Sequence, residues 1–291
     1  MFLPNETNEE LKQSIRSWWH KNPFIYDKHR GAEKNQEPVL DWAFFRNTDQ
    51  KVIKWMSPWA HTGYPLLSNL VDYQALRGKK VLDIAVGTGW TTEQFCRAGA
   101  DVTAIDLTPR AVEITKRRLA LNNLYANVIE GDQENLQFPD ESFDYVMAWG
   151  CLMHSPNTQK AINEIHRVLK PGGKTGAMMY NKNSLHWKYF IWFGKGILRL
   201  KLLKYNEQEL SNRYTDGYKV GGNMLTKFYT PDEVAKMYEK FSHKKVNVCD
   251  GDGMMDFFPH RKLPLGKLLP LQTKRNCCKK WGQTLWIEAI K

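Results

Sequence analysis

Residues 80–89 read KVLDIAVGTG, a short apolar run that ends in a loop with two glycines. The run over 80–84 predicts a strand buried in a sheet, because it is apolar and stops at a glycine loop. Gly87 and Gly89 let the backbone turn tightly and approach a ligand without interference from a Cβ atom. Residues 91–98 have helical spacing, so a helix N-terminus would offer its amides and positive dipole end to that ligand. The stretch therefore predicts the first strand, loop and helix of a ligand-binding α/β fold.

The same alternation of short apolar runs and amphipathic segments continues along the chain. Six further strands are expected, at 101–105, 127–130, 143–149, 174–180, 245–249 and 283–290. Three further helices are expected, at 108–121, 158–169 and 231–241. Strands that alternate with helices over short connections form a parallel sheet. The predicted fold class is α/β: a Rossmann-like, seven-stranded, mostly parallel sheet with helices on both faces, an N-terminal helical lid and an insertion after the fifth strand.

Two parts of the chain fall outside this alternation. Residues 1–79 are rich in aromatic side chains and predict a helical cap that precedes the sheet domain at 80–291. Residues 182–229 lie between the fifth strand and the next helix, where an insertion sits above the carboxyl ends of the strands. We expect this insertion to form a cap over the substrate.

The insertion contains an apolar segment at 185–200 that predicts a helix. On a wheel at about 100° per residue, Lys188, Lys195 and Arg199 fall on one side, and apolar side chains cover much of the rest. Such a helix suits a lipid interface, so one interpretation is peripheral membrane contact through 185–204. We favour burial as a cap, because a helix that is apolar nearly all round is usually buried against protein.

Acidic side chains accompany the ends of the first three strands. Asp83 lies in the first strand, Asp106 directly follows the second and Asp132 follows the third. Ligands of such sheets bind beyond the carboxyl ends of the strands. Asp106, nineteen positions after Gly87, can accept hydrogen bonds from two ribose hydroxyls. Asp132 can accept one from an adenine amino group, so the set predicts a cofactor that contains adenosine.

The segment 81–181 resembles the core of class I S-adenosylmethionine-dependent methyltransferases of the type 11-like group, which includes the ubiquinone and menaquinone C-methyltransferases. The resemblance rests on VLDIAVGTG, VTAIDLT, EGDQENLQFPDESFD and HSPNTQKAINEIHRVLKPGG. It implies that S-adenosylmethionine is the cofactor and that the enzyme leaves S-adenosylhomocysteine. The residues it implies for cofactor binding are Asp83, Ala85, Gly87, Thr88, Gly89, Asp106, Leu107, Asp132, Gln133, Trp149 and Gly150.

Ala85 departs from this family, whose first loop residue is a glycine. We expect its methyl group to be tolerated and to shift the loop slightly. The competing interpretation is a nicotinamide dehydrogenase with a G-x-G-x-x-G loop. In that frame the third position is Trp90, although a small residue is needed there for the helix to pack on the strand. A dehydrogenase loop also has no use for Asp83 or Asp132, so we disfavour it.

Two residues are candidates for catalysis. His154 follows the fourth strand, in the loop that faces the donor methyl group in the resembling family, and its near-neutral pKa suits a general base. The alternative is that His154 only shapes this loop by hydrogen bonding. Tyr26 lies in the aromatic segment 18–27, which resembles a lid and would place Tyr26 over the cofactor or the acceptor. His61 and Tyr64 are further candidates for the pocket wall.

The formal net charge of +11 is carried by the last part of the chain. Residues 1–80, 81–180 and 181–291 hold net charges of +3, −3 and +11. A basic surface favours an anionic partner, so we expect a small-molecule acceptor that is anionic or linked to a lipid or a glycan. A non-catalytic S-adenosylmethionine-binding module that acts through a protein partner is the alternative. Methylation of nucleic acid ranks lower, because no amine-flipping motif follows the fourth strand, and no nucleic-acid partner is expected.

The five cysteines and the N-terminal residues bear on the compartment. The cysteines form an odd set without a C-x-x-C pair, which is typical of reduced thiols in a cytoplasmic protein. Residues 1–10 are polar and acidic, unlike a secretory signal, and no apolar run is long enough for a membrane-spanning helix. Adjacent Cys277 and Cys278 lack the spacing of zinc ligands, so no metal is expected.

Overall fold

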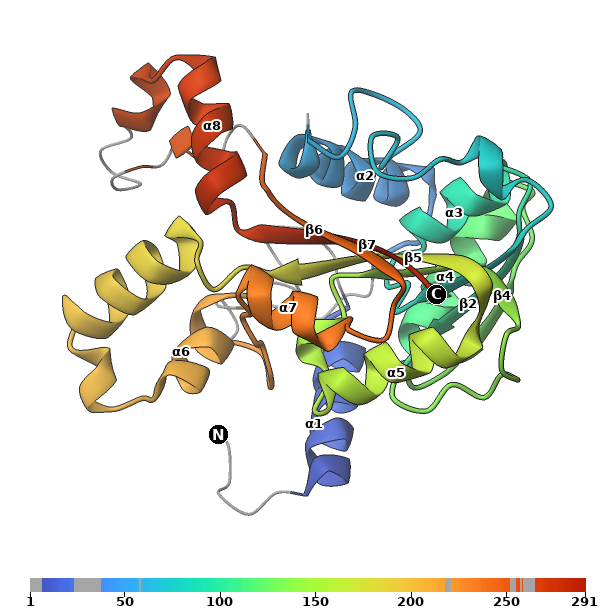
Figure 1. Ribbon diagram of the computed structural model, residues 1–291, viewed down its shortest axis with the longest axis horizontal. Coiled ribbons are helices and arrows are strands. Elements are labelled where there is room, and N and C mark those ends of the chain that lie inside the picture. The colour runs from blue at the N-terminus through green and yellow to red at the C-terminus, as the bar shows by residue number, and fades with distance from the viewer. Residues whose placement is uncertain are drawn as a thin grey trace.

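The computed structural model describes residues 7–23, 38–57, 59–217, 221–251, 255–256, 258 and 265–291. Its centre is one seven-stranded sheet with the strand order β3-β2-β1-β4-β5-β7-β6 (Figure 1). The strands are β1 Lys80–Ile84, β2 Asp101–Asp106, β3 Asn127–Glu130, β4 Phe143–Trp149, β5 Leu169–Tyr180, β6 His243–Cys249 and β7 Thr284–Ile290. Strands β1 to β5 are parallel, and β7 runs antiparallel between β5 and β6. The predicted seven-stranded, mostly parallel sheet is confirmed.

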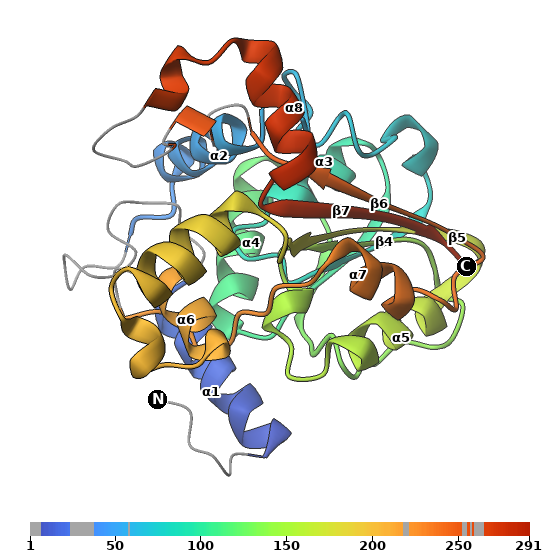
Figure 2. The same cartoon turned by 60° about the vertical axis from the view of Figure 1, so that its left-hand side comes forward.

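Helices cover both faces of this sheet, as predicted. They are α1 Asn8–Lys21, α2 Trp42–Met56, α3 Trp90–Arg97, α4 Pro109–Leu121, α5 Thr158–Val168, α6 Glu207–Tyr214, α7 Pro231–Met237 and α8 Leu271–Trp281. Side chains of α2 and α3 pack on one face with Val81 and Met147, and α4 lies beside them over β2 and β3. Side chains of α5 and α7 pack on the other face with Leu82 and Val146 (Figures 1 and 2). Successive side chains of each strand point to opposite faces of the sheet and therefore contribute to two separate hydrophobic cores.

The boundaries of these elements follow from capping and pairing. Thr108 and Thr230 each accept a hydrogen bond from a backbone amide in the first turn of the following helix, and a proline occupies that turn. The fifth strand begins five residues earlier than predicted, because Leu169 is buried and pairs with Phe143 before the register shifts. The segment PGG at 171–173 therefore lies inside the strand rather than in a loop before it.

The insertion 182–229 forms a helical layer at one end of the sheet (Figure 2). It contains a π-helix, η3 His186–Ile197, a short 3₁₀ turn, η4 Lys201–Leu203, and helix α6. Trp187, Ile191 and Leu210 are buried in the core that also contains Met178 of β5. The bonds of η3 join residues five apart, so the wheel at about 100° per residue does not describe it. No described helix is long and apolar enough to span a membrane.

Candidate active site

A cavity opens at the carboxyl ends of β1 to β4, with an empty volume of about 1160 Å³ including its mouth. Its wall is made by α1, by the loops after the first four strands and by the end of β5. Of the predicted site residues, those that line the cavity are Ala85, Gly87, Thr88, Asp106, Leu107, Asp132, Gln133, Trp149, Gly150 and His154.

The glycine loop enters the cavity in a left-handed backbone conformation. Gly87 and Gly89 have φ of 55° and 73°, which suits glycine. Ala85 also has a positive φ, 58°, and its amide donates a hydrogen bond to the Ile105 carbonyl at 2.7 Å. Gly89 is not among the cavity-lining residues: a Cβ atom there would lie 2.8 Å from Thr115 Cγ2. Gly89 therefore serves the close packing of α3 on α4.

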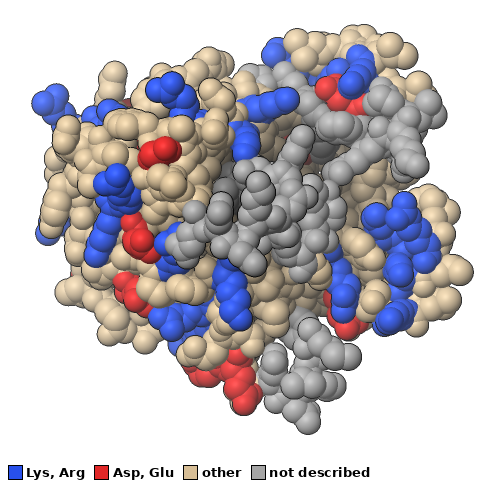
Figure 3. Space-filling model, turned by 180° about the vertical axis from the view of Figure 1, so that it is seen from behind, with Lys and Arg blue, Asp and Glu red and all other residues tan. Residues whose placement is uncertain are grey.

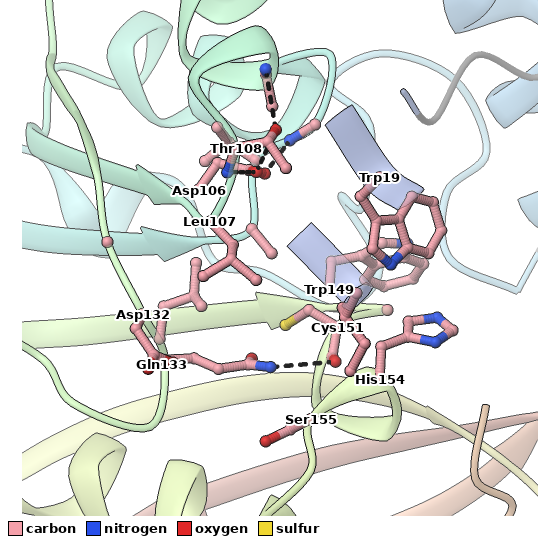
Figure 4. Close-up of a pocket in the computed structure, with 18 of the residues that line it drawn as sticks. Trp19, Asp106, Leu107, Thr108, Asp132, Gln133, Trp149, Cys151, His154 and Ser155 are labelled. Carbon is pink, nitrogen blue, oxygen red and sulfur yellow. Dashed lines mark hydrogen bonds between the residues drawn. The ribbon is translucent and has the colours of Figure 1, made fainter. Parts of the chain in front are cut away.

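Asp106 is held in place by the backbone around it (Figure 4). Its Oδ2 accepts a hydrogen bond from the Gly87 amide at 3.1 Å, and its Oδ1 accepts bonds from the amide and hydroxyl of Thr108 at 2.9 and 3.0 Å. Burial raises the pKa of Asp106, and these hydrogen bonds oppose that shift. The carboxylate links the glycine loop to the start of α4 and faces the cavity at the end predicted for the ribose.

Asp83 lies beneath the cavity and does not line it. Its Oδ2 accepts hydrogen bonds from the hydroxyls of Thr91 and Thr92 at 2.7 and 2.6 Å. Burial raises the pKa of Asp83 to about 7, against these two hydrogen bonds. Its Oδ1 is buried and has no hydrogen-bond partner in the described part of the chain. The geometry therefore does not indicate direct contact between Asp83 and a ligand. A contact through a bridging water molecule is compatible with it.

Asp132 and Gln133 form the opposite wall, where α1 meets the sheet. Lys12 Nζ lies 2.7 Å from Asp132 Oδ2 and 3.3 Å from Glu134 Oε2. The second oxygen of Asp132 accepts a hydrogen bond from the Glu134 amide at 2.8 Å. Gln133 Nε2 donates to the Cys151 carbonyl at 3.3 Å, which joins the loops after β3 and β4 (Figure 4). The carboxylate predicted to meet adenine is therefore already paired with a cation from α1.

Aromatic side chains close the end of the cavity at β4. Trp149 stacks on Trp59 with ring centroids 5.9 Å apart, and Trp90 meets Trp149 edge-on at 5.7 Å. Trp90 is buried and lines the cavity, so the bulky residue that disfavours a dehydrogenase loop is part of the wall. Trp149 Nε1 is buried without a hydrogen-bond partner among the described residues.

His154 lies at this same end, on the short 3₁₀ turn η2 Leu152–His154 (Figure 4). Its Nδ1 is 2.6 Å from the Leu225 carbonyl, and its Nε2 is 3.7 Å from Asp216 Oδ2. The Tyr180 hydroxyl donates to the same oxygen of Asp216 at 2.9 Å. Trp19 of α1 packs against the His154 ring with centroids 5.2 Å apart. Burial lowers the pKa of His154, although the charge of Asp216 and the bond to Leu225 oppose that shift.

Two other predicted residues are not brought into the described cavity, and a third is not among the described residues. His61 is buried beneath α2 in the helical layer, away from the cavity wall, and burial lowers its pKa. Tyr64 is 61% exposed, and its hydroxyl accepts a hydrogen bond from Gln94 Nε2 at 3.0 Å. The interpretation of His61 and Tyr64 as pocket residues was wrong, because an aromatic-rich segment does not indicate which side chains face a cavity. Tyr26 lies outside the described residues.

Four residues of the site were missed in the sequence. Lys12, Trp19, Tyr180 and Asp216 contact predicted site residues from distant parts of the chain. Tyr180 ends the fifth strand, so a search of all strand ends finds it. Lys12 and Trp19 lie seven positions apart in a helix, and this spacing places both on one face. Asp216 has no local signal, since it reaches His154 only through the fold of the insertion.

The cavity fits S-adenosylmethionine by the chemistry of its walls. Buried polar atoms normally have hydrogen-bond partners. Two atoms of the cavity wall have none among the described residues: Trp149 Nε1 is a donor, and Gln133 Oε1 is an acceptor. An amino acid group such as that of methionine carries both an acceptor carboxylate and a donor ammonium. The acidic side chains suit the ribose and adenine ends, as described for Asp106 and Asp132.

Comparisons with known proteins agree with this site. Residues 81–173 match the methyltransferase domain family. The chain is 41% identical over 98 residues to a demethylmenaquinone methyltransferase of Tropheryma whipplei, a match that covers 33% of this chain and 40% of that relative. It is 27% identical over 250 residues to a ubiquinone/menaquinone biosynthesis C-methyltransferase of Bartonella tribocorum, which covers 82% of this chain and 85% of the relative.

A solved structure shows the same fold. The PH0226 protein of Pyrococcus horikoshii superimposes with a TM-score of 0.51 and 15% identity, over 91% of this chain and 99% of that one. The matched residues 81–173 contain the glycine loop, Asp106 and strands β2 to β4. Residues 81–173 therefore match a methyltransferase domain, and the solved structure shares the fold of the chain.

Proposed function

We propose that the protein transfers the methyl group of S-adenosylmethionine to an apolar, ring-containing small molecule and releases S-adenosylhomocysteine. The observation that carries this proposal is the placement of His154. It faces the same cavity as the cofactor residues, but from the opposite end, and it is held by Leu225 and Asp216 of the insertion. Cofactor and acceptor would therefore meet within one cavity, with a basic nitrogen beside the acceptor.

The hydrogen bond to Leu225 sets the tautomer of His154. A carbonyl oxygen can only accept, so the proton of the neutral ring lies on Nδ1 and the lone pair lies on Nε2. Burial lowers the pKa of His154, which keeps the ring neutral at physiological pH. Asp216 lies 3.7 Å from Nε2 and stabilises the imidazolium that forms when the ring takes a proton. His154 is thus prepared to act as a general base.

The reaction needs little from the protein beyond positioning. S-adenosylmethionine supplies the electrophilic methyl group when it is bound. The chain holds the acceptor in line, and His154 Nε2 takes the proton from the acceptor atom as that atom forms its bond to the methyl carbon. The carbon–sulfur bond breaks and its electron pair remains on sulfur, so the products are the methylated acceptor, S-adenosylhomocysteine and a proton on His154.

The acceptor class follows from the cavity wall. Apart from the cofactor residues, the wall includes the aromatic or apolar side chains of Ile15, Trp19, Pro156, Met178 and Tyr180, beside polar residues such as Thr91, Thr108, Glu134 and Ser155. Lys12 is the one basic side chain among the described lining residues, and it is paired with Asp132 and Glu134. The wall therefore supports an apolar ring, alone or lipid-linked, better than an anionic group. Both curated relatives compared above are named for steps of quinone biosynthesis, which agrees with a ring-shaped acceptor.

Two measurements test this function. Calorimetric titration with S-adenosylmethionine, S-adenosylhomocysteine, NAD and NADH should show binding of the first two only. Release of S-adenosylhomocysteine is then followed with phenols and quinols, each with and without an isoprenoid tail. We expect turnover with members of this series and its loss in His154→Ala, with cofactor affinity retained. Binding without turnover on any acceptor would favour a non-catalytic module, and binding of a nicotinamide cofactor alone would overturn the proposal.

A further inference from the structure

Six leucines at one end of the molecule are exposed rather than buried. Leu198, Leu200 and Leu203 lie at the end of η3 and in η4, and Leu265, Leu268 and Leu271 lie in the 3₁₀ turn η7 Leu265–Leu268 and at the start of α8. Each is at least half exposed, and Leu203 and Leu268 reach 83% and 82%. Single exposed leucines are ordinary, but two groups of three on the same side of the molecule indicate an interaction surface (Figures 1 and 2). We refer to these six residues as the leucine surface.

Both groups reach the same end of the molecule. In Figures 1 and 2, the η3–η4 layer and α8 extend past β5, β6 and β7 on one side, away from the edge formed by β3. A ring contact of 5.3 Å between Tyr189 of η3 and Phe258 links the insertion to the segment that leads toward η7. The leucine surface therefore combines two elements that are separated by some 60 residues in the chain but lie at one pole of the fold.

Within the two segments that carry the leucine surface every charged side chain is basic, and one of these, Lys274, is paired with Asp256 at 2.6 Å. Residues 185–204 contain five basic and no acidic side chains, and so do residues 265–281. These two segments thus hold ten basic residues of a chain whose formal net charge is +11. On the face that Figure 3 shows, Lys and Arg atoms gather in two groups on the corresponding side, with some acidic atoms beside each. Exposed leucines with lysine and arginine between them match the pattern of interfacial, membrane-binding elements.

We propose that the leucine surface docks the protein on anionic phospholipid, with the leucines at the depth of the headgroups and the basic side chains against lipid phosphates. Charge complementarity selects this occupant. A bilayer offers apolar depth and a continuous negative potential to two separate basic elements at once. A second copy of this chain would bring like charges together, since all ten charged side chains of the two segments are positive.

The insertion carries one half of the leucine surface and also two residues at the acceptor end of the cavity. The insertion carries Leu200 and Leu203 at its outer end, and Asp216 and Leu225, which contact His154, at its inner end. Docking would therefore bring the acceptor end of the cavity close to the bilayer. Delivery of a lipid-linked acceptor by this route rests on the proposed function, whereas docking itself does not.

Vesicle sedimentation tests docking without any acceptor. The full chain is mixed with phosphatidylcholine vesicles that contain about one third phosphatidylglycerol, and with pure phosphatidylcholine vesicles. We expect it to sediment with the first and not with the second, and binding to weaken as salt increases. The paired change Leu203→Ser with Leu268→Ser should lower the partition coefficient at least about tenfold, because apolar insertion is lost while every charge remains.

Matched variants at the opposite edge serve as controls. Tyr125 precedes β3 and is strongly exposed, so Tyr125→Ser removes exposed apolar surface of similar size elsewhere. It should leave vesicle binding unchanged, and circular dichroism with cofactor titration should show that all variants are folded. Absence of binding to anionic vesicles, or equal binding of the double serine variant, would overturn the proposal. Leucine-dependent dimerisation without vesicle binding, measured by light scattering, would overturn it in favour of a second copy of the chain.

Discussion

The ammonium of Lys12 in α1 lies 2.7 Å from the carboxylate of Asp132, which directly follows the third strand and its glycine. These residues are 120 positions apart in the chain. Partial burial disfavours the charge of Lys12, but bonds to Asp132 and Glu134 outweigh it and raise the pKa of Lys12. The pair joins the N-terminal helix to the rim of the cavity, so α1 completes the wall at the end expected for adenine.

Lys12→Met should loosen α1 and weaken cofactor binding. Without the ammonium, Asp132 and the buried Glu134 lose their cation, which costs about 1–3 kcal/mol. We expect the dissociation constant for S-adenosylmethionine to increase about tenfold. Hydrogen exchange in residues 8–21 should accelerate. Lys21→Met in the exposed last turn of the same helix is the control, and equal affinity in the two variants would contradict a role for this pair.

Asp106→Asn should weaken cofactor binding without unfolding the protein. Asparagine retains one acceptor oxygen for the amide and hydroxyl of Thr108, but its amide nitrogen cannot accept from Gly87, and the negative charge that a ribose diol would meet is lost. The expected loss of affinity for S-adenosylmethionine is about tenfold or more. Titration calorimetry measures it, with Asp101→Asn at the exposed start of β2 as the control. Unchanged affinity in a folded variant would show that the ribose lies elsewhere.

Asp83→Asn should change how stability depends on pH. The pKa of Asp83 is raised by burial to about 7, while an unfolded aspartate titrates near about 3.9. The native state therefore retains a proton between about pH 4 and pH 7, and wild-type stability falls as pH rises through this interval. The difference in the free energy of unfolding between Asp83→Asn and wild type should increase by up to about 4 kcal/mol between about pH 4 and pH 7. Above about pH 7 this difference should stay constant. Denaturant titrations at several pH values measure this, and parallel curves for the two proteins would refute it.

Ala85→Gly should stabilise the protein slightly. A left-handed conformation costs an alanine about 1–2 kcal/mol, whereas the entropic cost of glycine is about 0.5–1 kcal/mol. With φ of 58° at Ala85, the net gain is expected to be up to about 1 kcal/mol, and Ala85→Val should destabilise by more than that. Ala120→Gly in the exposed face of α4 is the contrasting control and should destabilise by about 1 kcal/mol. If Ala85→Gly and Ala120→Gly change the free energy of unfolding in the same direction, the backbone at Ala85 is not strained.

Asp216→Asn should move the pH dependence of turnover. His154 must be neutral to take a proton, so kcat falls as pH drops through its lowered pKa. Loss of the Asp216 charge removes the effect that raises this pKa, so the acid limb should shift to lower pH. The maximal rate should also fall, because the imidazolium is less stabilised. Exposed Asp232→Asn is the control, and an unmoved acid limb would assign Asp216 a purely structural role.

The cofactor end of the site could be predicted because its signals are local. Gly87, Asp106 and Asp132 fall within 46 residues, and each lies at or just after the end of a strand that its own neighbours define. The acceptor end combines residues such as Trp19, His154 and Asp216, whose contacts depend on how distant segments pack. No short-range pattern encodes that packing.

The burial of Asp83 and the helix type of the insertion could not be predicted from the sequence either. Asp83 has the position expected of a ligand-facing acid, yet the hydroxyls of Thr91 and Thr92 hold it beneath the cavity. In the insertion, the helical period was taken as that of an α-helix, whereas η3 has the longer turns of a π-helix. The burial of Asp83 and the helix type of η3 both depend on how the folded segments pack, and the spacing of residues in the sequence does not report that packing.

The bond between His154 and Leu225 has an evolutionary consequence, because Leu225 and Asp216 both belong to the insertion. An exchange of that segment alters the shape of the acceptor space and the ionisation of the base in one step, and it leaves residues 83–133 untouched. A change of acceptor can therefore evolve while the residues that line the cofactor end of the cavity stay the same. Relatives that share the domain at 81–173 are free to differ in what they methylate and in the pH at which they work best.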